Sequence, residues 1–588
     1  MSGDGTIAAG GLLNEAMSRI GFSVMAFDSY PAEIRGFGRC VTRSRIGDQE
    51  MLALADRTHI LISLDDEQSR SRLTTLVEDA MVFFDNKPPS YVDEGQSIAG
   101  HVRPETSLFG APFGDLARKA SGTDRGRNLV ALGVFAAVSG LPTWPFHKVV
   151  QKKFAPKGEK VLQNNLKSFD GGYEYGLEAF SEQNVSLFSS SGENEEIEDR
   201  VLLSGNAAIA KGALDAGLDL YFGYPITPAT PIMEMLAKAL PEKGGRLMQM
   251  EDEISSIGAV LGSFYAGKRA MTATSGPGLA LMTELISYGV MAEIPAVIVD
   301  AQRGGPSTGL PTKTEQSDLH AAVFGGPGDS PRIVIAPTNV IECYEFTLRS
   351  FQFAEKYQTP VIVLTDFFLH NRVENIRPFQ AEADAVKDWN VYPDIQASGT
   401  EGEGSYKRFE LTESGISPRA IPGMKGVIFT TTGLEHSEAG APDYSPDTHT
   451  EMTEKRYRKI NGALHDLYPP EEFSPGGMLS VGVIAWGSTF GAALEAVRRG
   501  QEKGLRTGVL KVASLFPYHA KEIRSFMERC EEIVIPELNF DGQLANLIGH
   551  LHRKDVVRIN RVTGVPMGAS VILSKIEEIL AKPGGGNR

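Results

Sequence analysis

Seven short runs of β-branched and aromatic residues alternate with helical patterns between residues 201 and 364. Such runs predict strands, and their alternation with helices predicts a doubly wound parallel sheet. The expected strands are Val201–Leu203, Leu218–Phe222, Leu247–Met250, Ala270–Ala273, Ala296–Val299, Arg332–Ile335 and Pro360–Leu364. Because the carboxyl ends of parallel strands meet at one edge of a sheet, we expect the functional loops to gather there.

Four polar segments lie after or near these strands, between Tyr224 and Ser317. They are Tyr224–Pro228, the acids Glu251–Glu253, Thr274–Gly278 and a Gly/Thr-rich loop that runs from Arg303 to Gln316. All four lie at or near the start of an expected helix. They are therefore the first candidates for a functional site.

Glu253 is the strongest single candidate because of its helical phase. If residues 251–266 form a helix, the side chains that share a face with Glu253 are Ile254, Ile257, Val260, Leu261 and Phe264. A carboxylate on such a face is unfavourable unless it is paired or protonated. The alternative is that Glu251, Asp252 and Glu253 only cap the helix and complement its dipole.

The four segments together resemble a known enzyme family. Gly223-Tyr-Pro-Ile-Thr-Pro228, Met250-Glu-Asp-Glu253, Thr272-Ala-Thr-Ser-Gly-Pro-Gly278 and the Arg303–Gln316 loop are similar to the alpha subunit of 2-oxoacid:ferredoxin oxidoreductases, and most similar to the 2-oxoglutarate branch. The resemblance implies an enzyme that interconverts 2-oxoglutarate and coenzyme A with succinyl-CoA, CO2 and reduced ferredoxin. Four motifs in the same order are far more specific than any one of them.

The resemblance continues through most of the chain and implies a multidomain α/β fold. We expect a Rossmann-like gamma domain, a pyrimidine-type thiamine diphosphate-binding domain with a doubly wound sheet, and a transketolase C-terminal-like domain. The segment Pro536–Gln543 resembles a motif of the last of these domains. The expected bounds are gamma domain 1–181, acidic and Ser-rich linker 182–199, pyrimidine-binding domain 200–375, irregular insert 376–475 and C-terminal domain 476–588.

The resemblance also implies roles for individual residues around the cofactor. Glu253 is expected to hydrogen-bond the aminopyrimidine ring of thiamine diphosphate and so support its activation. The other residues expected to hold the cofactor are Tyr224, Pro225, Ile226, Ser275 and Gly276.

Arg303 is expected to bind the substrate's C1 carboxylate, and Thr227 could donate to the same carboxylate or to the ketone. Ser307, Thr308, Thr312 and Lys313 offer donors and a cation for a distal carboxylate, which would select a dicarboxylic oxoacid.

The segment Ser29–Gly36 resembles the gamma-domain segment YPSEIRGG, which is associated with coenzyme A. Arg35, Gly36 and Arg39 are therefore candidates for contacts with coenzyme A phosphates. The alternative is that Arg35 forms a structural ion pair in a loop.

The chain is expected to supply only half of the active site. Gly3-Asp4-Gly5 imitates the start of a thiamine diphosphate metal motif, but no Asn follows at the required distance. Cys40, Cys343 and Cys530 stand alone and lack iron–sulfur spacing. No metal ligand is therefore assigned to this chain. We expect Mg²⁺ and a 4Fe–4S cluster on a beta subunit, ferredoxin as electron carrier, and an alpha-beta or alpha2-beta2 assembly.

Bulk properties narrow the partners further. The chain has 58 Lys and Arg against 74 Asp and Glu, a net charge of −16, which argues against a nucleic-acid partner. We see no cationic leader at its start and no apolar run of membrane-spanning length, so we expect a cytoplasmic protein without a membrane partner.

Three alternatives stay open. The same machinery could act on pyruvate or a branched-chain oxoacid. The glycine-rich start followed by Asp28 imitates a dinucleotide fingerprint, which would suit an NAD-dependent dehydrogenase, although no strand precedes it and the start could lie upstream. A non-catalytic scaffold for electron carriers is the third. Glu435, His436 and His449 could hold a metal, but a surface insert suits their irregular spacing better.

Overall fold

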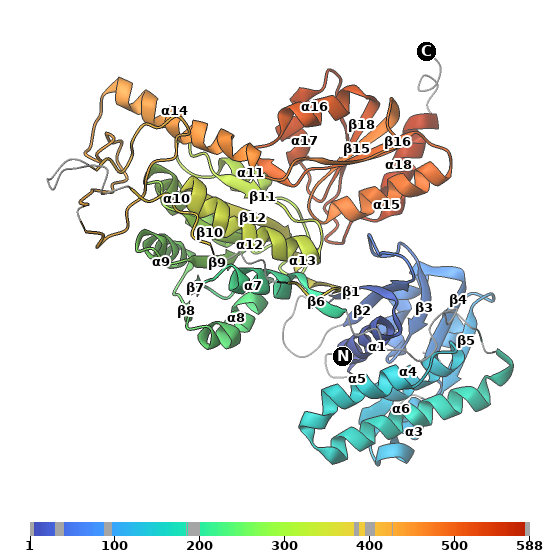
Figure 1. The fold of residues 1–588 in the computed structure, drawn as a ribbon. Coiled ribbons are helices and arrows are strands. Elements are labelled where there is room, and N and C mark those ends of the chain that lie inside the picture. The colour runs from blue at the N-terminus through green and yellow to red at the C-terminus, as the bar shows by residue number, and fades with distance from the viewer. Residues whose placement is uncertain are drawn as a thin grey trace. The chain divides into compact units, whose positions relative to one another are not determined.

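The computed structural model describes residues 5–29, 40–87, 97–183, 185, 200–380, 387–393, 406–425 and 427–581. The chain divides into two compact units (Figure 1). The first contains Met1–Leu202 and Val373–Pro378, and the second contains Leu203–Arg372 and Phe379–Arg588. No helix among the described residues is both long and apolar enough to cross a membrane.

The first unit contains two small sheets. One has the order β2-β1-β13-β6, and the other has three parallel strands in the order β3-β4-β5. The strands are β1 (Ser23–Ser29), β2 (Val41–Gly47), β3 (Thr58–Ile62), β4 (Leu76–Asp85), β5 (Ser107–Ala111), β6 (Val201–Ser204) and β13 (Arg372–Ile376). β1 pairs antiparallel with β2, and there the Thr42 hydroxyl donates to Asp28 at 2.7 Å. Asp28 is thus engaged inside the sheet.

Helices cover these sheets and form the core of the first unit. They are α1 (Thr6–Ile20), α2 (Asp66–Ser69), α3 (Phe113–Ser121), α4 (Arg127–Val138), α5 (Trp144–Phe154) and α6 (Glu159–Ala179). α4 and α6 cross closely at two glycines. A Cβ at Gly133 would lie 2.2 Å from the Phe169 carbonyl oxygen, and a Cβ at Gly172 would lie 2.2 Å from that of Val130. Only glycine permits this approach of the two backbones.

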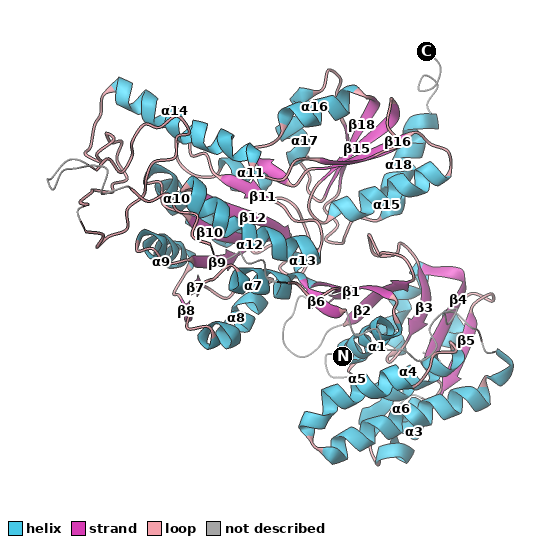
Figure 2. Cartoon of the chain, in the orientation of Figure 1, coloured by secondary structure: helices cyan, strands magenta, loops and turns pink. Residues whose placement is uncertain are grey.

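The second unit is built on a seven-stranded sheet in the order β17-β11-β12-β10-β9-β7-β8 (Figure 2). All neighbours are parallel except the edge pair β11 and β17. The strands are β7 (Leu220–Gly223), β8 (Arg246–Gln249), β9 (Ala270–Thr274), β10 (Ala296–Gln302), β11 (Ile333–Ile335), β12 (Pro360–Asp366) and β17 (Ser514–Phe516). The predicted α/β fold with a parallel sheet is confirmed.

Two details of the strand prediction were wrong. The run at Val201 does form a strand, β6, but this strand lies next to β13 in the other sheet. The strand β10 continues to Gln302, three residues beyond the predicted end. The added residues include Asp300 and Gln302. Their polar side chains end the apolar run in the sequence, but both residues are buried in the structure.

The helices of the second unit alternate with its strands, as their apolar periodicity predicts. Before the insert they are α7 (Gly205–Asp215), α8 (Thr230–Glu242), α9 (Glu253–Tyr265), α10 (Gly276–Met291), α11 (Leu319–Phe324), α12 (Val340–Tyr357) and α13 (Phe367–Asn371). The region expected to be an irregular insert contains a helix of 17 residues, α14 (Pro446–Gly462). The sequence did not indicate α14, because most of its residues are polar and give no apolar helical pattern.

A second sheet follows in this unit, in the order β14-β16-β15-β18-β19. Its strands are β14 (Glu471–Phe473), β15 (Leu479–Ala485), β16 (Thr507–Lys511), β18 (Cys530–Glu537) and β19 (Val557–Asn560). Its helices are α15 (Thr489–Glu502), α16 (Ala520–Glu528), α17 (Gln543–Ile548) and α18 (Ala569–Ala581). The pairing of β17 with β11 joins this region to the seven-stranded sheet.

The order of the strands creates a natural binding position. The chain passes from β7 to β8 on one side and then returns to β9 on the other side of β7. Such a reversal opens a crevice at the carboxyl ends of the two inner strands, and ligands of α/β proteins bind in crevices of this kind. β7 ends at Gly223 and β9 ends at Thr274, so Tyr224–Pro228 and Ser275–Gly278 begin there.

Candidate active site

Glu253 is a buried acid at the first position of α9. The residue is only 6 % exposed, and its carboxyl group accepts no hydrogen bond from any described residue. Asp252 precedes it as the N-cap and accepts a hydrogen bond from the Ser255 backbone N–H at 2.7 Å. The capping function therefore belongs to Asp252, and the carboxyl group of Glu253 is left for another partner.

The helical phase argument was correct for most of α9. Ile257, Val260, Leu261 and Phe264 are buried, but Ile254 is 47 % exposed. The prediction for Ile254 was wrong because no described element covers that side of the first turn.

Gly278 makes room for Glu253. A Cβ at this position would lie 2.6 Å from Glu253 Oε1 and 2.0 Å from Thr274 Oγ1. The backbone at the start of α10, just after β9, thus lies directly against the carboxyl group of Glu253. Ser275 is fully buried at the N-cap of α10, yet its hydroxyl has no hydrogen-bond partner among the described residues. Glu253 and Ser275, two polar groups without partners in the described part of the chain, therefore both lie at the helix starts that border the crevice.

The sequence segment after β7 is partly open. Tyr224 is 44 % exposed, Pro225 is exposed, and Ile226 and Thr227 are half-buried. These residues leave the sheet at the crevice and offer apolar surface beside the polar groups.

Arg303 follows β10 directly and contacts the segment after β7. Its Nη1 donates to the Thr227 carbonyl oxygen at 2.7 Å, while its enclosed Nε has no partner in the described part of the chain. Burial lowers the pKa of Arg303, and the nearby charge of Asp318 partly opposes this shift. Arg303 forms no salt bridge with a described residue, so a buried cation with donors to spare lies beside Thr227.

The loop from Arg303 to Gln316 is closed at its base by backbone hydrogen bonds. Gly304 N donates to Lys313 O at 3.0 Å, and Leu310 N donates to Gly304 O at 2.7 Å. Gly309 requires glycine, because its φ is +47° and a Cβ would lie 2.2 Å from the Gly304 carbonyl oxygen. Ser307 and Thr308 lie beyond this closure and are exposed.

The remaining predicted residues of this loop differ in burial. Thr312 is buried, and no described residue forms a hydrogen bond with its hydroxyl. Lys313 is half-buried, and its stem packs against Gly564, where an added Cβ would lie 2.9 Å from the Lys313 Cβ. No hydrogen bond joins Ser307, Thr308, Thr312 or Lys313 to Arg303 among the described residues. Their predicted roles stay predictions.

The end of the loop is fastened to the C-terminal region. Gln316 N donates to Leu538 O at 2.8 Å, and Asn539 Nδ2 donates to Gln316 O at 2.8 Å. Gln543 Nε2 donates to Ser317 O at 2.8 Å. The motif-like segment Pro536–Gln543 therefore holds the far end of the loop that begins at Arg303.

Three family models match successive parts of the chain. Residues 211–455 match the family model described as pyruvate flavodoxin/ferredoxin oxidoreductase, thiamine diphosphate-binding. Residues 1–175 match pyruvate ferredoxin/flavodoxin oxidoreductase, and residues 480–574 match pyruvate:ferredoxin oxidoreductase core domain II.

Relatives of similar length carry consistent names. The chain is 32 % identical over 99 % of its length to 2-oxoglutarate oxidoreductase subunit KorA of Mycobacterium tuberculosis, of which it covers 90 %. It is 33 % identical over 78 % of its length to 2-oxoacid:ferredoxin oxidoreductase 2, subunit alpha, of Aeropyrum pernix, of which it covers 72 %. The chain belongs to the family of 2-oxoacid:ferredoxin oxidoreductase alpha subunits. The predicted family and its oxidoreductase class are thereby confirmed.

A solved structure of this oxidoreductase family has the same fold throughout. The 2-oxoglutarate:ferredoxin oxidoreductase from Magnetococcus marinus, with 2-oxoglutarate, coenzyme A and succinyl-CoA bound, matches with a TM-score of 0.91 and 35 % identity. The match covers 98 % of both chains.

Two acids of the oxidoreductase chain escaped the sequence analysis. Asp300 in β10 is fully buried, and neither of its carboxyl oxygens has a partner among the described residues. Asp318, just before α11, has an enclosed Oδ2 without a described partner, and its pKa is raised to about 6, chiefly by burial. The signal for Asp300 was present in the sequence, because an acid inside the apolar run Ala-Val-Ile-Val-Asp must be buried if the run is a central strand.

Other candidate residues have structural contacts or lie outside the description. Glu435 accepts from Arg456 Nη2 at 2.9 Å and contacts His449 Nδ1 at 2.6 Å, while His436 packs on Phe409. No group of His, Cys, Asp and Glu among the described residues is arranged to hold a metal ion. Arg35, Gly36 and Arg39 lie outside the described residues.

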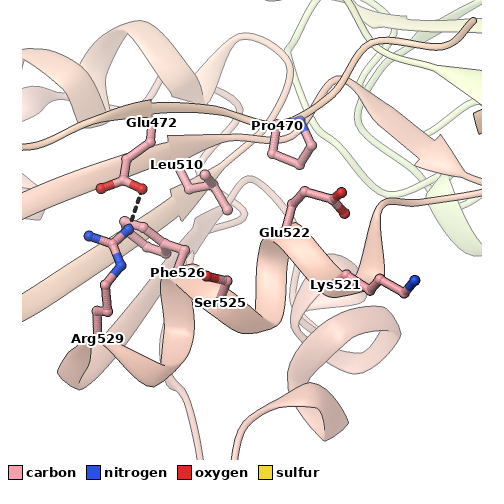
Figure 3. Close-up of a pocket in the computed structure, with 8 residues that line it drawn as sticks. All are labelled: Pro470, Glu472, Leu510, Lys521, Glu522, Ser525, Phe526 and Arg529. Atoms are coloured by element: carbon pink, nitrogen blue, oxygen red, sulfur yellow. Dashed lines mark hydrogen bonds and ion pairs between the residues drawn. The ribbon is translucent and has the colours of Figure 1, made fainter. Parts of the chain in front are cut away.

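One further hollow lies in the C-terminal region (Figure 3). It measures about 370 Å³ and is lined by Pro470, Glu472, Leu510, Lys521, Glu522, Ser525, Phe526 and Arg529. Glu472 and Arg529 face each other there as an ion pair. None of the predicted site residues lines it, so it is separate from the crevice.

Proposed function

We propose that this chain is the alpha subunit of a cytoplasmic 2-oxoglutarate:ferredoxin oxidoreductase that converts 2-oxoglutarate and coenzyme A to succinyl-CoA and CO2, and that the reaction can also run in reverse. The support is the likeness over 98 % of the chain to a 2-oxoglutarate-bound relative, together with the crevice residues. The single observation that carries the proposal is the Glu253 carboxyl group at that crevice, which belongs to a residue only 6 % exposed and accepts no hydrogen bond from any described residue.

The crevice suits the aminopyrimidine half of thiamine diphosphate. When bound, this cofactor supplies the electron sink that decarboxylation of a 2-oxoacid requires. Glu253 accepts no hydrogen bond from a described residue, so its carboxyl group can share a proton with a ring nitrogen, and the enclosed Ser275 hydroxyl also has no partner among the described residues. Gly276 brings backbone close, and Tyr224, Pro225 and Ile226 offer apolar surface for a flat ring.

Arg303 and Thr227 suit the oxoacid end of the substrate. The spare donors of Arg303 can bind the C1 carboxylate, and the contact with the Thr227 carbonyl fixes the guanidinium. The enclosed hydroxyl of Thr312, with Ser307, Thr308 and Lys313, is proposed to meet the distal carboxylate. A dicarboxylic acid would bring a second charge that these groups can match.

The rest of the active site is proposed to come from a beta subunit. That subunit would hold Mg²⁺, the pyrophosphate and a 4Fe–4S cluster, and would pass electrons to ferredoxin, in an alpha-beta or alpha2-beta2 assembly. Arg35, Gly36 and Arg39 are proposed to contact coenzyme A. The domain bounds 1–181, 182–199, 200–375, 376–475 and 476–588 are part of the same proposal.

The test is turnover by the complex purified from its host. We expect a second chain with a brown colour, and coenzyme A-dependent reduction of ferredoxin or a dye with 2-oxoglutarate. Pyruvate and branched-chain oxoacids should be turned over at least about tenfold less efficiently, since a charged pocket left unmatched costs more than 1.4 kcal/mol. Preferred turnover of either acid would replace the substrate in this proposal.

Lys313→Ala sharpens the substrate assignment. We expect it to reduce kcat/KM for 2-oxoglutarate and to leave that for pyruvate almost unchanged, because only the dicarboxylate would lose a cation. Unchanged selectivity would remove Lys313 from the site. Nicotinamide-dependent turnover by the isolated chain would instead favour a dehydrogenase.

A further inference from the structure

Asp300 and Asp318 lie on the same polar edge of the crevice as Arg303. Asp300 and Gln302 alternate along β10 and so point to the same face of the sheet. The Asp318 backbone N–H donates to Gln302 Oε1 at 3.0 Å, which brings the segment before α11 onto this face. The two acids are therefore neighbours in space although 18 positions separate them in the sequence.

The carboxyl group of Asp318 is directed to the start of α10. Asp318 occupies the N-cap position of α11, but its side chain accepts no capping hydrogen bond there. A Cβ on Gly276 would instead lie 2.7 Å from Asp318 Oδ2 and 2.8 Å from Oδ1. Gly276 thus admits a carboxyl group to the positive end of a helix of 16 residues.

Asp300 must be neutral in this arrangement. Both of its oxygens are enclosed, and neither receives a hydrogen bond from any residue that the structure describes. An ionised carboxylate without water or a donor is strongly unfavourable, so the protonated acid is the stable form. Burial first, and then the charge of Asp318, raise the pKa of Asp300 well above its ordinary value.

The charged groups that face Asp318 are few. Burial and the charge of nearby Glu315 raise its pKa, Arg303 lowers it, and the net result is a pKa of about 6. At pH 7 the Asp318 carboxyl is therefore mostly ionised and acts as the long-range counter-charge of Arg303. No direct salt bridge joins the two side chains among the described residues, so Arg303 keeps its donors free.

We propose that Asp318 takes up one proton from solvent when the carboxylate of an oxoacid binds to Arg303, while Asp300 stays protonated behind it. This inference rests on the proposed function, since it needs an anionic substrate at Arg303. The substrate carboxylate replaces Asp318 as the counter-charge of Arg303. It also adds a like charge beside Asp318, which favours the neutral acid.

The sign of the pH effect follows from this exchange. A group whose pKa rises on binding takes up a proton wherever it is ionised in the free site, here above about pH 6. Oxoacid affinity should therefore fall as pH rises from about 6, by up to about tenfold per pH unit, the limit for one linked proton. Proton uptake should be small below that pH.

The experiment is calorimetric titration of the assembled complex with 2-oxoglutarate, without coenzyme A, at pH 7. Buffers with different ionisation enthalpies report the number of protons exchanged. We expect uptake of most of one proton per site in the native enzyme and close to none in Asp318→Asn. The apparent Kd of Asp318→Asn should also become nearly independent of pH between 6 and 8.

Two further variants separate this exchange from a general structural effect. Asp300→Asn replaces a neutral acid by a neutral amide of the same shape, so the proton uptake should persist. Asp329→Asn removes an exposed acid from the loop after α11 and should leave proton uptake as in the native enzyme. Both variants can still be measured if Asp318→Asn fails to fold. Loss of proton uptake in Asp300→Asn would then assign the proton to Asp300 and overturn the proposal.

The outcomes distinguish this inference from the proposed function. Binding of 2-oxoglutarate without proton uptake, or with equal uptake in Asp318→Asn, overturns the proton exchange alone. Absence of binding by any 2-oxoacid overturns the proposed function, and the inference with it.

Discussion

Two buried clusters of charge in the second unit differ in how well they are satisfied. The first cluster surrounds Glu293. Lys455 and Lys459 both form ion pairs with its carboxylate, the Lys459 pair at 2.6 Å, and Arg408 Nη2 donates to its carbonyl oxygen at 2.7 Å. Arg408 Nη1 also donates to Gln358 Oε1 at 3.0 Å. At the crevice, Glu253, Arg303 and Asp300 are also buried, but Arg303 Nε and both Asp300 carboxyl oxygens have no partner among the described residues, and no described residue donates to Glu253.

The difference separates structure from function. Both clusters cost desolvation energy, but around Glu293 ionic and hydrogen bonds compensate for it within the chain. That cluster fastens α14 and the segment before it to the sheet. Around Glu253 and Arg303 the compensation is missing, which a site that awaits a ligand can tolerate and a purely structural core cannot.

Glu253→Gln should have the largest effect on activity. The amide keeps the shape of the side chain but cannot share its proton, so kcat of the assembled complex should fall about 10³-fold, within the usual range for a lost acid–base group. Thermal unfolding should be almost unchanged, because no hydrogen bond from a described residue is lost. Undiminished decarboxylation would refute the assignment of Glu253.

Glu293→Gln should show the reverse pattern. It leaves Lys455 and Lys459 buried with no carboxylate, which should cost about 3–5 kcal/mol of unfolding free energy. Denaturant or thermal unfolding measures this loss, and turnover at low temperature should persist. A stable variant would show that the ion pairs add little.

The same cluster predicts a loss of stability in acid. Burial opposes ionisation of Glu293, but Lys455, Lys459 and Arg408 outweigh it and hold its pKa below the ordinary value. This stabilisation is present above the unfolded pKa of about 4.5 and is lost as pH falls below it. Wild-type unfolding scans between pH 6 and 3 should show the decline, and Glu293→Gln should show a shallower one.

Local sequence patterns predicted the elements that carry the site. Runs such as Ala296–Val299 marked buried strands, and the phase of Ile257 and Phe264 marked the buried side of Glu253. Arg303 was chosen from the family resemblance and from its place shortly after a predicted strand, although that strand ends three residues later than predicted.

Contacts between distant segments could not be predicted in this way. Asp318 meets Gly276, and Gln316 meets Asn539 from 223 positions away, through pairings that no local period records. The helix α14 was missed because its buried residues include Lys455, Arg456 and Lys459, which a hydrophobic pattern counts as exposed.

Gly278→Ala should weaken the crevice without removing a functional group. The new Cβ would lie within 2.6 Å of Glu253 Oε1, so the carboxyl group must move. We expect about a tenfold fall in kcat, since small displacements of a catalytic group are costly. Gly262→Ala in α9 is the control: nothing lies within 4 Å of its Cβ, and it should leave activity unchanged while raising stability by about 0.5–1 kcal/mol. Equal kinetics for both variants would mean that Glu253 needs no fixed position.

Gln543→Ala should have the smallest effect. It tests how far the hydrogen-bonded C-terminal region supports the loop that begins at Arg303. It removes the hydrogen bond to Ser317 O at 2.8 Å and the one received from His320 N at 3.0 Å, so the end of the Arg303 loop loosens. At about 1 kcal/mol per hydrogen bond, KM for the oxoacid should rise several-fold, with a smaller change in kcat. Gln501→Ala is a matched control, because its Nε2 donates to Thr507 O, also at 2.8 Å, within the C-terminal sheet region. Similar losses of stability with a KM change only in Gln543→Ala would show that the loop anchor, and not general stability, positions Arg303.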